Sequence, residues 1–142
     1  MLPALRPFAE TEGPMTATRV GVFGLVLLCA ACGSTTSPSP VTLSFASTLA
    51  VKGTASLSFT VPTAGTVSIT LATLASTAEV GLGLGNPRSD GSGCQLFTSL
   101  NTVAGATAQI TNSAQPGPYC VEVYDVGNLT GATAFAVTIA HP

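Results

Sequence analysis

Hydrophobic and polar residues alternate in short runs along residues 41–142. In the run 55–61, for example, Leu57, Phe59 and Val61 are separated by Ser and Thr residues. Strict alternation places one row of side chains on a hydrophobic core and the other row in water, so it predicts a β-strand with one buried face. Strong alternation predicts strands at 55–61, 66–71, 80–84, 120–124 and 134–139, and weaker alternation predicts strands at 41–46, 95–101 and 106–111.

Residues that favour turns separate these runs. The turn segments are 62–65, 86–87, 90–93, 115–118 and 127–128. The stretch 72–79 is the only candidate for a helix, and we interpret it as the end of a strand followed by a loop. About eight short strands at this spacing predict one all-β domain, either an antiparallel β-sandwich or a barrel.

A different pattern precedes the domain. Residues 20–31 form an uninterrupted apolar run, VGVFGLVLLCAA, which is shorter than the roughly 20 residues of a membrane span but fits the h-region of a secretory signal. The small residues Ala30 and Ala31 precede Cys32, and this order resembles the lipobox of bacterial lipoproteins. The resemblance implies cleavage before Cys32 and lipid attachment to it, although Cys29 stands where the lipobox usually has Leu. The alternatives are a signal cleaved without lipidation, an uncleaved anchor and a buried core helix.

The start of the chain has two interpretations. Residues 1–14 are acidic and proline-containing and make a poor n-region, whereas a start at Met15 gives the short basic sequence MTATR. Either start leads to the same division of the chain. We expect a signal peptide over 1–31, a Ser/Thr/Pro-rich tether over 32–40 that spaces the domain from the membrane, and the β-domain over 41–142.

Charge is scarce and narrows the classes of function. The sequence has four Lys/Arg and six Asp/Glu, a net charge of −2, and 46% hydrophobic residues. A nucleic-acid-binding protein needs a dense positive face, and a disordered chain combines low hydrophobicity with high net charge. Both classes are excluded. From residue 41 onward there are 16 Thr and 10 Ser, so we expect the outward faces of the strands to be hydrated through hydroxyl groups.

Catalytic chemistry has few candidates in this sequence. The single His, His141, stands one residue from the end of the sequence, where we expect a frayed tail. Glu122 and Asp125 are expected on an outward face and in a turn as solvated charges. The glycines at 81, 83 and 85 alternate within a predicted strand, which favours close packing between sheets over a nucleotide-binding loop. We therefore expect neither enzymatic activity nor a cofactor.

Two cysteines fall within the domain. Because the signal predicts export to an oxidising compartment, a disulfide between Cys94 and Cys120 is the simplest interpretation. A metal site is the alternative, and it would need further Cys or His ligands nearby.

The order of motifs resembles bacterial pre-peptidase C-terminal domains. From Gln115 the sequence reads QPGPYCVEVYDVGNLTGATAFAVTIA, which is similar to that family's Gly-x-Tyr strand start, alternating Val-x-Val-Tyr strand, Gly-rich turn and last alternating strand. Residues 53–74, with the motif Ala-Gly-Thr-Val-x-Ile-x-Leu at 64–71, resemble the family's early pair of strands, and residues 80–91 resemble the strand and turn that follow. The resemblance covers roughly 53–140 and implies a jelly-roll-like β-sandwich that is non-catalytic and attached to exported proteins.

Four residues are candidate ligand contacts. Some members of the resembled family bind calcium through clustered acidic side chains, which points to Asp90 and Asp125 here, with turn capping as the alternative role. An exposed Tyr can stack on a sugar ring or anchor a peptide, which points to Tyr119 and Tyr124. The alternative for these rings is that they cover the edge of the sheet.

These observations lead to one functional hypothesis and one alternative. The hypothesis is an exported, lipid-anchored protein of the cell envelope, located at the outer membrane and facing the periplasm or the surface. Its single β-sandwich would serve as a non-catalytic structural or interaction module. Its partners would be the membrane, through the lipid on Cys32, and an envelope protein or a glycan. The alternative is a secreted module that binds carbohydrate or calcium.

Overall fold

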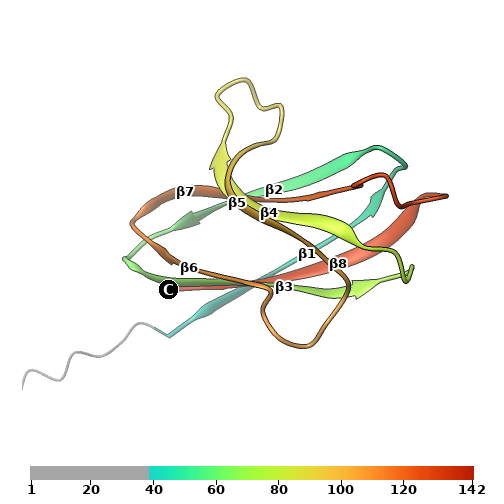
Figure 1. The fold of residues 1–142 in the computed structure, drawn as a ribbon. Helices are drawn as coiled ribbons and strands as arrows, with labels where there is room; N and C mark the ends of the chain where they lie inside the picture. The colour runs from blue at the N-terminus through green and yellow to red at the C-terminus, as the bar shows by residue number, and fades with distance from the viewer. Residues whose placement is uncertain (1–38) are drawn as a thin grey trace, which may run out of the picture. The chain divides into compact units, whose positions relative to one another are not determined.

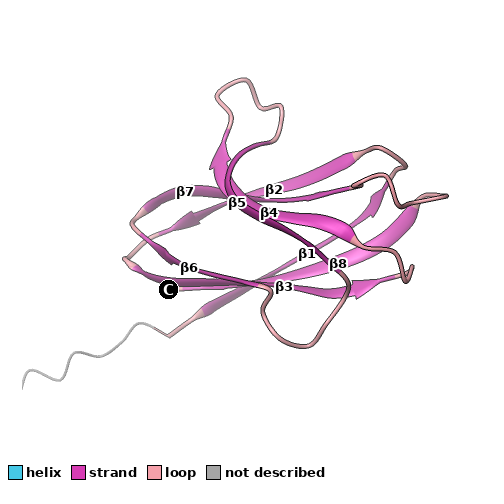
Figure 2. Ribbon diagram, viewed as in Figure 1, coloured by secondary structure: helices cyan, strands magenta, loops and turns pink. Residues whose placement is uncertain are grey.

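The computed structural model describes residues 39–142 of the chain. The predictions for the signal peptide, Met15, Cys32 and most of the tether lie outside these described residues. Residues 39–142 form strands joined by turns and loops, without a helix (Figure 2), so none of them forms a helix that could cross a membrane. The strands are β1 (Val41–Leu49), β2 (Thr54–Val61), β3 (Gly65–Leu74), β4 (Val80–Pro87), β5 (Cys94–Thr102), β6 (Ile110–Ala114), β7 (Gly117–Tyr124) and β8 (Thr133–His141).

The strands form two four-stranded antiparallel sheets that face each other (Figure 1). Sheet A has the order β1-β8-β3-β6, and sheet B has the order β2-β7-β4-β5. The chain crosses from one sheet to the other at every connection between described strands except the β4–β5 hairpin. This strand order is that of a jelly roll, a double sheet of eight strands. The predicted antiparallel β-sandwich is therefore confirmed.

Rows of aliphatic side chains fill the space between the sheets. The same alternation that predicts the strands predicts these inward rows, and each fully buried Val, Leu or Ile contributes roughly 1.5–3 kcal/mol. The fully buried members of the four central strands are Val67, Ile69, Leu71, Val137 and Ile139 in sheet A and Val80, Leu82, Leu84, Val121 and Val123 in sheet B.

One predicted strand begins later than expected. The weak strand predicted at 106–111 is observed as β6, which begins at Ile110, and a loop precedes it. In that loop Gln109 takes the place of a strand partner for β3. Its side-chain Oε1 accepts a hydrogen bond from the N–H of Leu71 at 2.7 Å, and its own N–H donates to the carbonyl of Ile69 at 3.0 Å.

Two further boundaries follow from the strand pairing. The predicted turn at Asn86–Pro87 lies instead at the end of β4, where both residues pair with β5, and the connection itself occupies residues 88–93. The stretch 72–79 is the end of β3, up to Leu74, followed by a loop. This confirms the interpretation of 72–79 as a non-helical segment.

His141 does not lie in a frayed tail, and that prediction is wrong. It is the last residue of β8 and pairs with Val41 at the start of β1. Its side chain is buried and stacks on the ring of Phe59, with 5.5 Å between the ring centroids. Because β1 pairs with β8 along its whole length, the strand ladder extends to His141 at the end of β8.

The outer faces of the two sheets differ in character. On sheet B, the outward side chains of β7 include Cys120, Glu122 and Tyr124. On sheet A, the outward side chains are small, uncharged and of three types. They are Thr42, Ser44, Ala46, Thr48, Thr66, Ser68, Thr70, Thr73, Thr111, Ser113, Ala134, Ala136, Thr138 and Ala140. The expected hydroxyl-rich surface is thus concentrated on sheet A.

Candidate functional site

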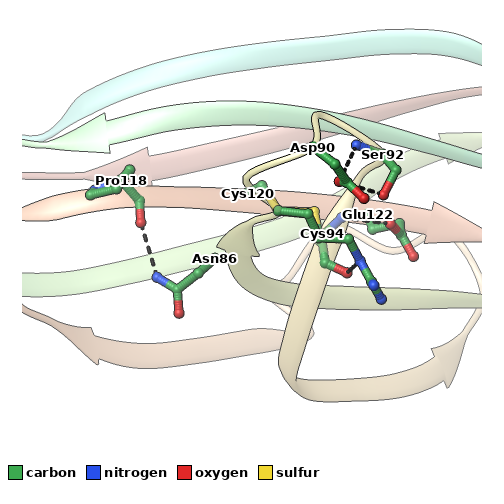
Figure 3. Close-up of a disulfide and its surroundings, with 8 residues drawn as sticks. Asn86, Asp90, Ser92, Cys94, Pro118, Cys120 and Glu122 are labelled. Atoms are coloured by element: carbon green, nitrogen blue, oxygen red, sulfur yellow. Dashed lines mark hydrogen bonds between the residues drawn. A yellow bond between two sulfur atoms is a disulfide. The ribbon is translucent and has the colours of Figure 1, made fainter.

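Cys94 and Cys120 form the predicted disulfide. Their Cα atoms are 5.9 Å apart, within the usual range for a disulfide. Cys94 begins β5 and Cys120 lies in β7, and β4 separates these two strands in the sheet. The disulfide therefore links both neighbours of β4 at one end of sheet B (Figure 3).

Two charged side chains hold the backbone of Cys94. The Glu122 carboxylate accepts a hydrogen bond from the N–H of Cys94 at 3.1 Å, and the Nε of Arg88 donates to the carbonyl of Cys94, also at 3.1 Å. This role of Arg88 and Glu122 was not predicted. A signal for Glu122 was present, because it stands two residues after Cys120 and must face outward on the same side of the strand.

Asp90 caps the turn that carries Cys94. Its Oδ1 accepts hydrogen bonds from the hydroxyl of Ser92 at 2.7 Å and from the N–H of Ser92 at 2.9 Å (Figure 3). These bonds, the hydroxyl's first, lower the pKa of the Asp90 carboxyl. Asp90 also lines an open depression of about 500 Å³ together with Arg88, Ser89 and Gln95. Its arrangement is that of an Asx turn.

Asp125 fastens two loops at the other end of sheet B. Its Oδ2 accepts a hydrogen bond from the N–H of Lys52 at 2.7 Å. Its Oδ1 accepts bonds from the N–H groups of Gly127, Asn128 and Leu129 at 2.8, 3.0 and 3.2 Å. These backbone donors, with the Lys52 N–H first among them, lower the pKa of Asp125. The carboxylate thus ties the loop after β7 to the β1–β2 turn.

Tyr119 closes the β6–β7 turn. Its hydroxyl donates to the carbonyl of Gln115 at 3.1 Å and accepts from the N–H of the same residue at 3.0 Å. Its ring packs against Phe59 on one side and against the half-exposed Phe97 on another, with centroid separations of 6.0 and 6.4 Å. Both the hydroxyl and the ring are therefore engaged within the domain.

Tyr124 lies across the central strand of sheet B. It pairs directly with Gly81 of β4, and a Cβ placed on Gly81 would meet the Tyr124 ring. The absence of a side chain at Gly81 is what allows the ring to lie flat on the sheet. The ring covers a central strand rather than the sheet edge that the alternative interpretation specified.

The glycines of β4 face outward, so the prediction that they pack between the sheets is wrong. Val80, Leu82 and Leu84 occupy the inward positions of this strand. Leu96 covers Gly83, and the backbone of β5 passes over Gly85. These glycines let β5 and β7 side chains and the β5 backbone close over β4, a placement that alternation alone does not reveal.

The four candidate ligand residues do not converge. Asp125 follows the residue that pairs with Gly81, near the start of β4, whereas Asp90 lies in the turn after the end of that strand. Tyr119 and Tyr124 point to opposite faces of β7. Within residues 39–142, no three His, Cys, Asp or Glu side chains lie close enough together to hold a metal ion. What converges at one end of sheet B is a structural cluster made of the disulfide, Arg88 and Glu122.

A search of protein-family models gives no match for this chain, and a search of curated proteins gives none either. The resemblance to pre-peptidase C-terminal domains therefore stays a prediction from the quoted motifs.

Proposed function

We propose that this chain is an exported, lipid-anchored protein of the cell envelope whose β-sandwich is a non-catalytic structural or interaction module. The fold and the motifs together favour a module similar to the pre-peptidase C-terminal domains. In this proposal the lipid on Cys32 anchors the chain to the outer membrane, and the tether over 32–40 holds the sandwich away from the lipid surface.

The observation that carries the proposal is the Cys94–Cys120 disulfide. Disulfides persist in oxidising compartments and are rare where thiols are kept reduced. This one joins strands on both sides of β4, and the hydrogen bonds of Arg88 and Glu122 to Cys94 brace its surroundings. The chain therefore carries a covalent link suited to an exported protein.

The use of the charged groups supports a non-catalytic role. Four charged side chains form hydrogen bonds with backbone groups of the domain: Asp90, Asp125, Glu122 and Arg88. The ring of His141 is buried against Phe59, and its Nδ1 lies 2.8 Å from the carbonyl oxygen of Pro142. These groups hold turns and strand ends in place.

Metabolic labelling with a fatty-acid analogue tests the anchor. In a bacterial host, the full chain should incorporate the label and fractionate with membranes. Cys32→Ser should lose both properties, and Cys29→Ser, the matched control, should keep them. Unchanged labelling of Cys32→Ser would overturn the proposed lipid site, and labelling that is lost only in Cys29→Ser would move that site.

A further inference from the structure

The sandwich has four edge strands, and the four are protected to different degrees. An edge strand exposes unpaired N–H and C=O groups, and proteins protect such edges with charges, prolines, bulges or short strands. On one side of the sandwich, β5 contains an irregularity opposite Leu84/Gly85, and β6 has only five residues. On the other side, β2 has eight residues, one fewer than β1, and Gly93 of the β4–β5 turn lies over its outer face next to Ser56.

β1 has none of these protections within the described residues. Its nine residues, VTLSFASTL, include no charge and no proline. Its pairing with β8 runs in unbroken register from Val41↔His141 to Leu49↔Thr133. It is therefore a long, regular and neutral edge.

The inward row of β1 is also incompletely covered. Leu43 and Phe45 are only half-buried, although their partners in β8, Ile139 and Val137, are 0% exposed. Phe45 packs edge-on against Phe135, with 5.3 Å between the centroids. The row is open because β1 has a described strand on one side alone, and a further strand with the same alternation would extend the core.

We propose that β1 pairs antiparallel with β1 of a second copy of this chain, about a two-fold axis at Phe45. In this register the Phe45 residues of the two copies face each other, and Leu43 faces Ser47 of the second copy. On the outer face, Ser44 faces Ala46 and Thr42 faces Thr48 of the second copy. The two A sheets become one continuous sheet.

The neutrality of β1 argues for a second copy as the occupant. In an antiparallel pair, like charges directly opposite each other are destabilising, and self-pairing of VTLSFASTL places no charges opposite each other. β1 has nine residues, so its central residue, Phe45, lies on the two-fold axis of the pair. Because Phe45 faces the core, the apolar rows of both copies meet on the core side. The Thr/Ser/Ala face likewise continues across the junction.

This inference gives the proposed interaction module a partner and rests on that proposal, but it does not require the lipid anchor. Anchoring would add to association, since tethered copies have a raised effective concentration. Measurements on Cys32→Ser separate the two ideas, because that variant loses the anchor and should keep the β1 pairing.

Sedimentation of the purified full chain in detergent tests the pairing. The double variant Ser44→Lys/Ala46→Lys places lysines opposite each other across the junction, on side chains that already face water. Its dimer should dissociate at least tenfold more readily, which corresponds to about 1.4 kcal/mol. The matched control Thr111→Lys/Ser113→Lys adds the same charges to the edge strand β6 and should leave the dimer unchanged.

Charge reversal sharpens the test. Ser44→Glu/Ala46→Glu should also be monomeric, and mixing it with the Lys variant should restore a heterodimer. In the unaltered chain, amide exchange in β1 should slow as protein concentration rises. A wild-type chain that stays monomeric up to about 100 μM would overturn the proposal. Equal effects of the β1 and β6 variants, or concentration-independent exchange in β1, would overturn it too.

Discussion

The carboxylate of Asp125 accepts a hydrogen bond from the backbone N–H of Lys52, 73 residues earlier in the chain. The backbone bonds in return, because the N–H of Asp125 donates to the carbonyl of Gly53 at 3.0 Å. The β1–β2 turn and the loop after β7 are therefore fastened to each other by one residue.

Removing this carboxylate should loosen both loops. Asp125→Asn keeps the shape of the side chain but replaces a charged acceptor, and the melting temperature at pH 7 should fall by several degrees in a thermal scan. Glu79→Gln, which changes an exposed carboxylate in the β3–β4 loop, is the control and should melt like the wild type. Equal melting temperatures for all three proteins would contradict the fastening role.

Acid should reduce the difference between Asp125→Asn and the wild type. Folding lowers the pKa of Asp125, so its stabilisation is fully present above the unfolded pKa, about 3.9, and is lost as pH falls through the lower folded pKa. Asp90, whose pKa is lowered as well, adds to the loss of stability in the same window. Melting temperatures measured from pH 7 down to pH 2 should therefore converge for the two proteins.

Lys52→Gly should stabilise the domain. Lys52 has φ of 56°, and it is the only non-glycine residue with positive φ among the described residues. This conformation costs an ordinary residue about 1–2 kcal/mol, and Gly at this position removes that cost. Part of the gain in stability is offset by the greater conformational freedom of Gly in the unfolded chain. A net gain of about 0.5 kcal/mol is expected in denaturant titrations, whereas Val51→Gly, at the neighbouring position, should destabilise.

Loss of the disulfide should lower the free energy of unfolding by much more than the change expected at Lys52. The cysteines are 26 residues apart, and closing a loop of that size stabilises by about 3–4 kcal/mol in the chain-entropy model. Cys94→Ala/Cys120→Ala should show this loss in denaturant titrations. A thiol reductant should destabilise the wild type by a similar amount and leave the double variant unchanged, and a reductant effect on both would point to another cause.

The loss of stability on replacing an outward glycine of β4 by Ala should depend on what covers that glycine. Gly85→Ala pushes a Cβ into the backbone of β5 near Gln95, which cannot move aside, so a loss of about 1–3 kcal/mol is expected. Gly81→Ala should cost less, because the Tyr124 ring can swing away. Gly131→Ala, with no atom within 4 Å of the added Cβ, should be neutral. Thermal melts that reverse this order would contradict the packing described for β4.

Calcium should leave the melting temperature unchanged. The Asp90 and Asp125 carboxylates accept their hydrogen bonds from nearby N–H and O–H groups and lie at different ends of β4. Calcium requires six to eight converging oxygens. A thermal scan with millimolar CaCl₂ against one with MgCl₂ measures this, and a calcium-specific rise would revive the ligand-binding alternative.

Much of the fold was predictable because alternation acts locally. The rows around Leu57, Val67, Leu82, Val121 and Val137 predict five strands, and each lies where the structure has one. The start of β6 was misplaced because Gln109, a polar side chain, completes the edge of β3 with its amide, an interaction that no two-residue period encodes.

The arrangement around the disulfide was only partly predictable. Cys94 and Cys120 are the two cysteines of the domain, so their pairing followed from composition and export. The hydrogen bonds of Arg88 and Glu122 to Cys94 depend on how the β4–β5 turn folds back toward β7. The sequence around each of these residues does not predict that fold of the turn. The contacts of Tyr119 and Tyr124 within the domain could not be predicted for a similar reason, because Gly81 and Gln115 decide what their rings and hydroxyls contact.

The Val41–His141 pair has a consequence for how force passes through the molecule. The chain enters the sandwich and reaches its last residues at the same end, so a load applied between residue 40 and a protein fused after Pro142 acts first on this single pair. Such a load would peel β1 from β8 one pair at a time instead of shearing all nine pairs together. The domain would yield to weak pulling along that route and resist pulling between Val41 and Thr133, which lie at opposite ends of the two paired strands, because the whole ladder then shares the load.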